Sequence, residues 1–138
     1  MILWYRGAMR ILGIDYGTKR IGIALSDEAG QFALPHSVVQ NSKAALEEIS
    51  AIASQNGVKE IVLGESRNYK GEANAILADS LEFKKALEGK GFTVHLELEF
   101  MTSMNAERFQ GKNELHDASA AALILQSFLD RRRSKEQV

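Results

Sequence analysis

The sequence predicts an α/β fold whose five-stranded mixed sheet has three antiparallel strands, then two parallel strands, with helices on both faces. Two observations predict it. Within the first 40 residues, apolar side chains alternate with a period of two, and glycine-containing turns separate three such runs. Beyond residue 42, amphipathic helical segments alternate with short apolar runs, which is typical of helices that join parallel strands.

The three antiparallel strands are expected at residues 10–15, 20–26 and about 32–40. Gly17 lies between the first two strands, and Gly30 lies between the second and the third. Pro35 cannot donate a ladder hydrogen bond, so the third strand is expected at the edge of the sheet.

The second half of the chain is expected to form two crossovers and a final helix. The run 60–64 is continuously apolar after its first residue, as in a strand buried on both faces. Right-handed crossovers would then place helices on both sides of the sheet. This order is that of the RNase H-like three-layer fold, which nucleases, resolvases and actin-like kinases share, so the fold alone does not decide the function. The predicted elements are a helix at 42–55, a strand at 60–64, a helix at about 74–88, a strand at 92–100, a short helix or turn at 101–110 and a helix at 114–132.

Length and composition indicate one globular domain. The chain has 138 residues, of which 45% are hydrophobic and 25% charged. It has no cysteine, which excludes disulfides, thiolate metal sites and a cysteine nucleophile, and favours a cytoplasmic location. Residues 9–138 are expected to form a single RNase H-like domain. Residues 1–8 are expected to be an N-terminal extension, as from a start codon assigned too early, because their apolar run is too short for a signal peptide or a membrane span.

The net charge of −1 excludes a global basic field, but local basic patches can still bind phosphate. The run Arg131–Arg133 has two interpretations: cations that favour a helix C-terminus, or a phosphate-binding tail. The residues predicted to contact nucleic acid are Lys19, Arg20, Arg108, Lys112, Arg131 and Arg132.

Three acidic residues lie at the ends of predicted strands or at the start of a predicted helix. Each of them has a simple structural explanation. Asp15 ends the first strand on the face of Ile11 and Gly13, and it could be a turn residue. Glu99 lies near the end of the fifth strand, and it could belong to a solvent-exposed strand face. Asp117 opens the last helix, where an acid favours the helix dipole.

The predicted topology brings these acids to one edge of the sheet. Carboxylates that lie close together repel one another unless a cation lies between them. Oxygen ligands of this kind select Mg²⁺ or Mn²⁺. Two such ions can activate water and stabilise the leaving oxygen of a phosphodiester. Glu65, directly after the central strand, is a candidate fourth acid.

Both ends of the chain resemble the YqgF/RuvX family, whose members are described as Holliday junction resolvases or pre-16S rRNA nucleases. Residues 10–27 are close to the opening motif of the family, and residues 117–130 are close to its closing motif. The resemblance implies that Asp15, Glu99 and Asp117 are metal ligands. Glu65 falls where RuvC-type resolvases carry an acid, by similarity of strand position alone.

The middle of the chain departs from the family pattern. Gly64-Glu65-Ser66 stands where the family usually has Gly-Leu-Pro. Leu98-Glu99-Phe100 stands where it usually has Asp-Glu-Arg, so an arginine that would contact phosphate or an acid is missing. These departures favour a second hypothesis, a catalytically silent module that binds nucleic acid or assists ribosome assembly.

Asp15, Gly17 and Thr18 also resemble the phosphate loop of sugar kinases and actin-like ATPases. Those proteins enclose ATP with a second domain, which 138 residues cannot provide. The leading hypothesis is therefore a metal-dependent endonuclease for structured nucleic acid, either Holliday junction-like DNA or precursor 16S rRNA. A resolvase that cuts two strands symmetrically is expected to be a two-fold dimer, whereas a processing RNase can be a monomer.

Overall fold

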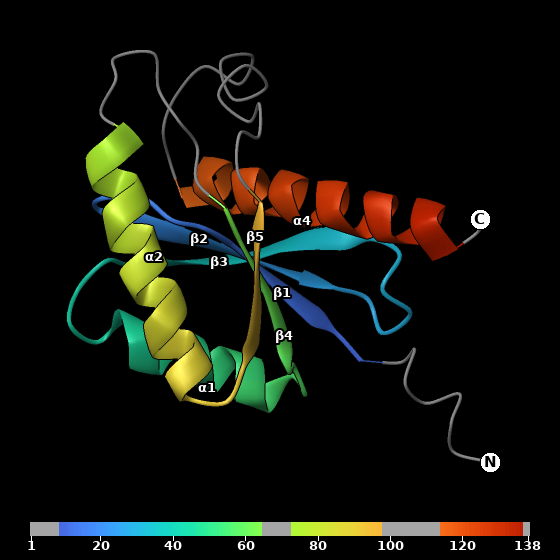
Figure 1. Cartoon of the computed structure of the whole chain (residues 1–138), viewed down its shortest axis with the longest axis horizontal. Helices are drawn as coiled ribbons and strands as arrows, with labels where there is room; N and C mark the ends of the chain where they lie inside the picture. The colour runs from blue at the N-terminus through green and yellow to red at the C-terminus, as the bar shows by residue number, and fades with distance from the viewer. Residues whose placement is uncertain (1–8, 65–72, 98–113, 137–138) are drawn as a thin grey trace.

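The computed structural model describes residues 9–64, 73–97 and 114–136. Figure 1 shows one twisted sheet with helices on both of its faces, which confirms the predicted fold class. The strands lie in the order β3-β2-β1-β4-β5. The elements are β1 (Ile11–Asp15), β2 (Arg20–Ser26), β3 (Ala33–Gln40), α1 (Ala45–Gln55), β4 (Glu60–Gly64), α2 (Ala73–Gly89), β5 (Thr93–Glu97) and α4 (Glu114–Glu136).

The pairing of the strands is also as predicted. β1, β2 and β3 form an antiparallel meander, while β4 pairs with β1 and β5 pairs with β4, both in parallel. β3 is the outermost strand on its side of the sheet, as the proline at position 35 indicated. The parallel register aligns Asp15 with Gly64 and Gly64 with Glu97, so the carboxyl ends of β1, β4 and β5 meet at one edge.

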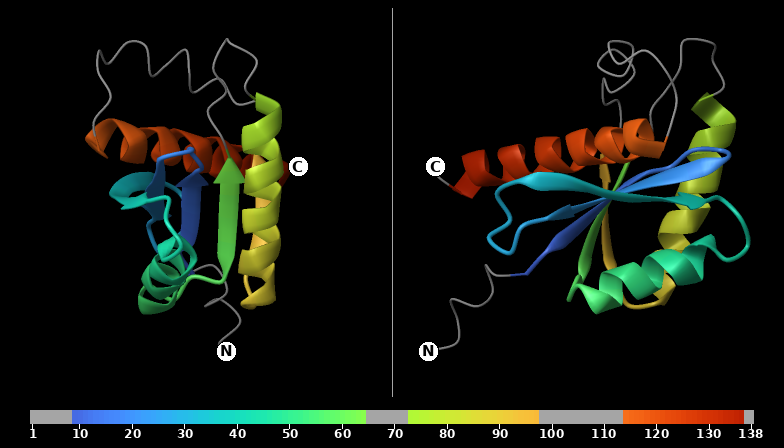
Figure 2. Two further views of the ribbon diagram at one scale, coloured as in Figure 1. Left: turned by 90° about the vertical axis from the view of Figure 1, so that its left-hand side faces the viewer. Right: turned by 180° about the vertical axis from the view of Figure 1, so that it is seen from behind.

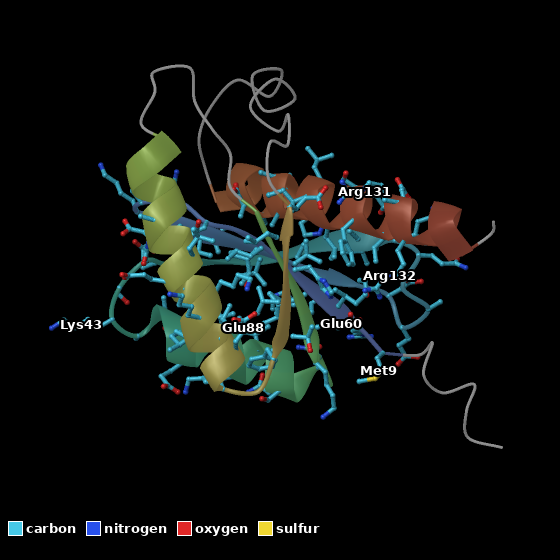
Figure 3. The ribbon with its side chains drawn as sticks, in the orientation of Figure 1. Met9, Lys43, Glu60, Glu88, Arg131 and Arg132 are labelled. Carbon is cyan, nitrogen blue, oxygen red and sulfur yellow. The ribbon has the colours of Figure 1, made fainter. Side chains whose placement is uncertain are left out.

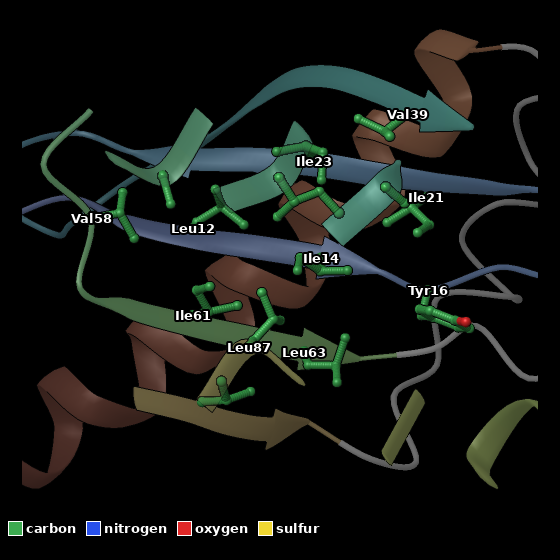
Figure 4. Close-up of a cluster of buried hydrophobic side chains, with 14 of the residues drawn as sticks. Leu12, Ile14, Tyr16, Ile21, Ile23, Val39, Val58, Ile61, Leu63 and Leu87 are labelled. Carbon is green, nitrogen blue, oxygen red and sulfur yellow. The ribbon is translucent and has the colours of Figure 1, made fainter. Parts of the chain in front are cut away.

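Two hydrophobic cores lie on the two faces of the sheet. The larger one packs Leu12, Ile14 and Leu63 against α1 and the end of α2, and Figure 4 shows its side chains. The smaller one packs Ile11, Ala24 and Val62 against α4. Figure 2 shows the same arrangement, with α4 on one side of the sheet and α1 and α2 on the other.

Several helices and strands begin or end at other residues than predicted. The first helix begins at Ala45 instead of residue 42, because the preceding residues form a turn closed by a hydrogen bond from Ala45 N to Ser42 O over 3.0 Å. Phe92 precedes β5 because its N–H donates back to Leu87 O at the end of α2. The last helix extends four residues beyond the predicted end at 132, to Glu136. The predicted turn at 101–110 and the end of the predicted fifth strand lie outside the described residues.

Small residues let α4 pack closely on the sheet. A Cβ atom on Gly13 would lie 2.7 Å from Leu125 Cβ, and one on Gly64 would lie 2.9 Å from Ile124 Cγ2. Ala118 and Ala121 face the sheet from α4 and are buried, as the run of small residues in this helix predicts. The two glycines therefore set the distance between α4 and the strands that end at the aligned edge.

Replacing Gly13 by alanine is expected to destabilise the protein by about 1–2 kcal/mol, because the added methyl group must displace Leu125 in a filled core. Urea unfolding would measure this change. Gly89→Ala is the matched control, because a Cβ there meets no atom within 4 Å. Equal stability of both variants would contradict the tight packing of α4.

Among the helices in the described ranges, none is long and apolar enough to span a membrane.

Candidate active site at the carboxyl edge of the sheet

Asp15 is the last residue of β1, and only 9% of its surface is exposed. Its face of the strand is that of Ile11 and Gly13, which contact α4, as predicted. The parallel ladder continues one residue further, since Tyr16 N donates to Gly64 O over 2.9 Å. The backbone therefore holds Asp15 within the sheet, so its carboxylate lies on a rigid support.

The first turn of α4 lies toward the same end of β1. Gly13 is next to Ala121 and Leu125, whereas Ile11, earlier in the strand, lines a cavity with Leu129. Helix and strand therefore run in roughly opposite directions. The backbone of Asp117, one turn before Ala121, is consequently brought toward Asp15, as the sequence predicts.

The other two predicted acids lie just beyond the described residues. β4 ends at Gly64, the residue before Glu65, and β5 is described as far as Glu97, two residues before Glu99. Arg108 and Lys112 also lie outside the described residues. Within the described part of the chain, no three His, Asp or Glu side chains are grouped as a metal site would need. The roles of Glu65 and Glu99 remain predictions.

Lys19 and Arg20 lie in the hairpin that follows Asp15. Asp15 pairs with Gly22, so the two cations lie just past the carboxyl end of β1. Asn41 fixes this turn: its N–H donates to Lys19 O over 2.9 Å, and its Nδ2 donates to Gly17 O over 2.8 Å. The structure therefore places both cations at the edge that Asp15 occupies.

Glu97 is a buried acid at this edge that the sequence prediction did not select. Only 3% of its surface is exposed. It forms an ion pair with Arg131, and Ser127 Oγ donates to its Oε2 over 3.3 Å. At Glu97 this strand face is not solvent-exposed, because α4 covers it there. The alternation of β5 indicated the face, but only the packing of α4 shows that the face is buried.

Glu97 and Asp15 do not form one cluster. They are two strands apart, with Gly64 between them in the register. Ile124 of α4 packs over Gly64 and fills that space. Among the described residues, Arg131 is the cation that pairs with Glu97. Asp15 lies on the other side of Ile124, toward the start of α4.

Arg132 belongs to a separate network at the start of β4. Its guanidinium donates to both carboxylate oxygens of Glu60, over 3.1 and 2.8 Å. His95 Nε2 lies 3.0 Å from Glu60 Oε2, and the guanidinium stacks 4.7 Å from the centre of the Phe128 ring. Figure 3 shows Arg131 and Arg132 pointing to different sides of α4. The two arginines thus contact different acids of the protein.

Hydrogen bonding to Arg132 is the main reason why the pKa of Glu60 falls from 4.5 to about 2; burial opposes it and His95 adds to it. Because the folded-state pKa is the lower one, the resulting stability is present above pH 4.5 and is lost as the pH falls toward 2. Glu60 is about one-third exposed, so solvent screening reduces this contribution to about 1 kcal/mol.

We therefore expect Glu60→Gln to lower the free energy of unfolding by about 1 kcal/mol near pH 6 and to have progressively less effect as the pH falls through 2. Urea unfolding over this pH range would measure it. Glu28→Gln, in an exposed turn, is the control and should behave as wild type throughout. A constant difference between Glu60→Gln and wild type at every pH would refute the assigned ion pair.

The fold matches solved resolvases. The RuvC protein of T. thermophilus, solved in complex with a Holliday junction substrate, aligns with a TM-score of 0.61 at 16% identity, over 91% of this chain and 96% of that one. A Fowlpox virus resolvase, solved with Holliday junction DNA, aligns with a TM-score of 0.50 at 12% identity, over 89% of this chain and 98% of that one. The chain therefore has the RNase H-like fold of these resolvases, with an acid at the end of its first strand.

Sequence comparison places the chain within this class. It belongs to the RuvX family, described as Holliday junction resolvase, whose model matches residues 9–131. A protein of Pelotomaculum thermopropionicum is 37% identical over 88% of this chain and 87% of its own length. One of Opitutus terrae is 38% identical over 90% of this chain and 93% of its own length. Both carry the name "Putative pre-16S rRNA nuclease". The family resemblance is confirmed.

Proposed function

We propose that this protein is a metal-dependent endonuclease that hydrolyses phosphodiester bonds in structured nucleic acid, either Holliday junction-like DNA or precursor 16S rRNA. One observation carries the proposal. Asp15 is a nearly buried carboxylate on a rigid strand end, at the edge toward which two parallel strands and the start of α4 converge. Membership of the RuvX family supports the reaction class, and either substrate would be met in the cytoplasm.

The donor chemistry at this edge suits Mg²⁺ or Mn²⁺. Asp15 supplies a carboxylate, and Glu97 is excluded because Arg131 already pairs with it. We assign Asp15, Glu99 and Asp117 as the metal ligands and Glu65 as a fourth catalytic acid. When bound, a pair of these ions would lower the pKa of water and stabilise the leaving oxygen.

The basic residues of the chain would bind and orient the substrate. Lys19 and Arg20 lie in the hairpin beside Asp15, where they can hold the phosphates that flank the scissile bond. The side chain of Arg131 is 60% exposed, so it can contact a phosphate while it pairs with Glu97. We also assign Arg108, Lys112 and Arg132 to phosphate contacts. Recognition would then rest on the shape of the nucleic acid, with two-fold symmetric dimers on a junction and monomers on RNA.

The second candidate is a catalytically silent module that binds nucleic acid or assists ribosome assembly. Phe100 stands where the family usually has an arginine beside the glutamate, which removes one cation from the reacting edge. In this case the fold and the basic hairpin would keep a binding role without cleavage.

The deciding experiment is a cleavage assay on a four-way DNA junction and on a precursor 16S rRNA fragment, each with Mg²⁺, with Mn²⁺ and with a chelator. We expect cleavage of at least one substrate with a metal and none with the chelator. Binding of both substrates without cleavage under any metal condition would overturn the nuclease and support the silent module.

A further inference from the structure

A second basic site lies at the opposite edge of the sheet. Here a cavity of about 550 Å³ opens between four segments: the residues before β1, the β2–β3 turn, the start of β4 and the end of α4. Figure 3 labels Met9, Glu60 and Arg132 in this region. The segments are far apart in the sequence, so only the folded chain assembles this cavity.

The cavity is strongly cationic. Among the described residues that line it, four are cations, Arg10, Lys59, Arg132 and Arg133, and one is an acid, Glu60. That carboxylate is already engaged by Arg132 and His95. The lining charge therefore favours an anionic ligand.

Arg10 and Lys59 contribute positive charge that no acid of the described residues neutralises through an ion pair. Arg10 Nη1 donates to the neutral side chain of Asn56, over 3.2 Å. Asn56 is itself held at the end of α1, where its Nδ2 donates to Ile52 O over 2.8 Å. Lys59 lies exposed beside the start of β4. Arg10 is thus positioned by a neutral partner that leaves its charge available.

The cations on α4 are also held in place. Glu60 binds Arg132 through both of its oxygens, and the Phe128 ring supports the guanidinium from the side. Arg133 pairs with Asp130 one turn earlier, over 2.7 Å. A ligand entering the cavity would meet the Arg132 guanidinium in a position that is already fixed, which lowers the entropic cost of binding.

The cavity and Asp15 lie at opposite ends of one strand. Ile11, the first residue of β1, lines the cavity, and Asp15 is the last residue of the same strand and on the same face. Four residues of extended strand separate them by roughly 13 Å. This corresponds to about four base-pair steps along a nucleic acid duplex. One substrate arm could therefore reach both places.

We propose that this cavity binds the phosphodiester backbone of the nucleic acid whose scissile bond lies at Asp15. The proposal rests on the proposed function, which it extends by a second contact site outside the reacting edge. A phosphodiester backbone fits because the cations come from separate segments around a cavity much larger than one phosphate group. A site for a free small anion is the alternative outcome of the test.

The test compares Arg10→Gln/Lys59→Gln with Lys84→Gln/Lys85→Gln, a control that removes two cations from α2. Affinity for a four-way junction and for a structured rRNA fragment is measured against salt concentration in the presence of a chelator. We expect the cavity variant to lower the slope of log K against log salt by roughly 1–2 and to weaken binding about 10-fold at moderate salt. The control should match wild type, and thermal melting should show that both variants fold.

Two results would overturn the proposal. One is a cavity variant whose affinity for nucleic acid, and whose slope of log K against log salt, equal those of wild type. A wild-type protein that binds neither nucleic acid would overturn the proposal in the same way. The other is a cavity variant that no longer binds inorganic phosphate, as measured by NMR, but binds nucleic acid as wild type does. That result would indicate a site for a small anion.

Single-turnover cleavage at saturating protein separates this proposal from the nuclease itself. The cavity variant should then cut at the wild-type rate, because the cavity lies away from Asp15. If wild type binds through the cavity but cuts nothing, the cavity proposal holds and the proposed nuclease fails. If wild type cuts and the cavity variant binds equally well, the nuclease holds and the cavity proposal fails.

Discussion

Asp15→Asn is expected to reduce the cleavage rate about 1000-fold, which corresponds to about 4 kcal/mol of lost transition-state stabilisation. The substitution keeps the size of the side chain but removes the negative charge that would hold the metal at the strand end. Binding of the nucleic acid should change little, because the phosphates are held by cations of other segments. Single-turnover cleavage and affinity, measured in parallel, check both expectations.

A metal titration tests the same substitution without relying on activity. Mn²⁺ should raise the melting temperature of wild type, because a ligand that binds only the folded state stabilises it, and Asp15→Asn should remove most of this increase. Asp27→Asn is a matched control, since this acid caps the β2–β3 turn at the other edge through Gln31 N and Phe32 N. Equal cleavage by wild type and Asp15→Asn would point to a contaminating nuclease and would remove Asp15 from the site.

Arg131→Met is expected to destabilise the fold by about 2–3 kcal/mol, because it leaves the carboxylate of Glu97 buried without its cation. Of its partners in the described part of the chain, Ser127 would remain as a hydrogen-bond donor to it. Glu97→Gln should cost less, since it removes the buried charge and leaves Arg131 in contact with water. Urea unfolding of both variants gives the comparison.

The double variant Glu97→Gln/Arg131→Met should recover part of the stability that Arg131→Met loses, because no buried charge is then left unpaired. Arg133→Met is the control, because its pair with Asp130 is exposed and contributes at most about 1 kcal/mol. If Arg131→Met and Arg133→Met cost the same, Glu97 would not depend on Arg131.

Local patterns were sufficient to predict the order of the elements. The alternation around Gly17 and Gly30 predicts the meander, and Pro35 predicts the edge strand, because each reflects a backbone constraint within a few residues. The ends of helices were less predictable. The turn before Ala45 depends on a backbone hydrogen bond that the periodicity of apolar residues does not report.

The candidate site, like the fold, has parts that the local sequence predicts and parts that it does not. A strand-end acid such as Asp15 can be recognised from its position after an apolar run, and its face follows from the two-residue period. Glu97 could not be recognised as buried, because its environment comes from α4, some 30 residues later in the chain. The pairings of Arg131 and Arg132 with different acids were hidden for the same reason.

By itself, the sequence determined the fold class and the family, because these rest on local periodicity and on motifs that are continuous along the chain. The same motifs predict Asp15 as the central acid of the site. Only the tertiary structure decided which arginine and lysine side chains pair with acids of the protein and which face the cavity without such a pair. Arg131 and Arg132 pair with Glu97 and Glu60, whereas Arg10 and Lys59 line a cavity without an ion pair to any acid of the described residues. The reason is physical: ion pairing acts between groups that are close in space, and the packing of α4 brings together residues that lie far apart in the sequence.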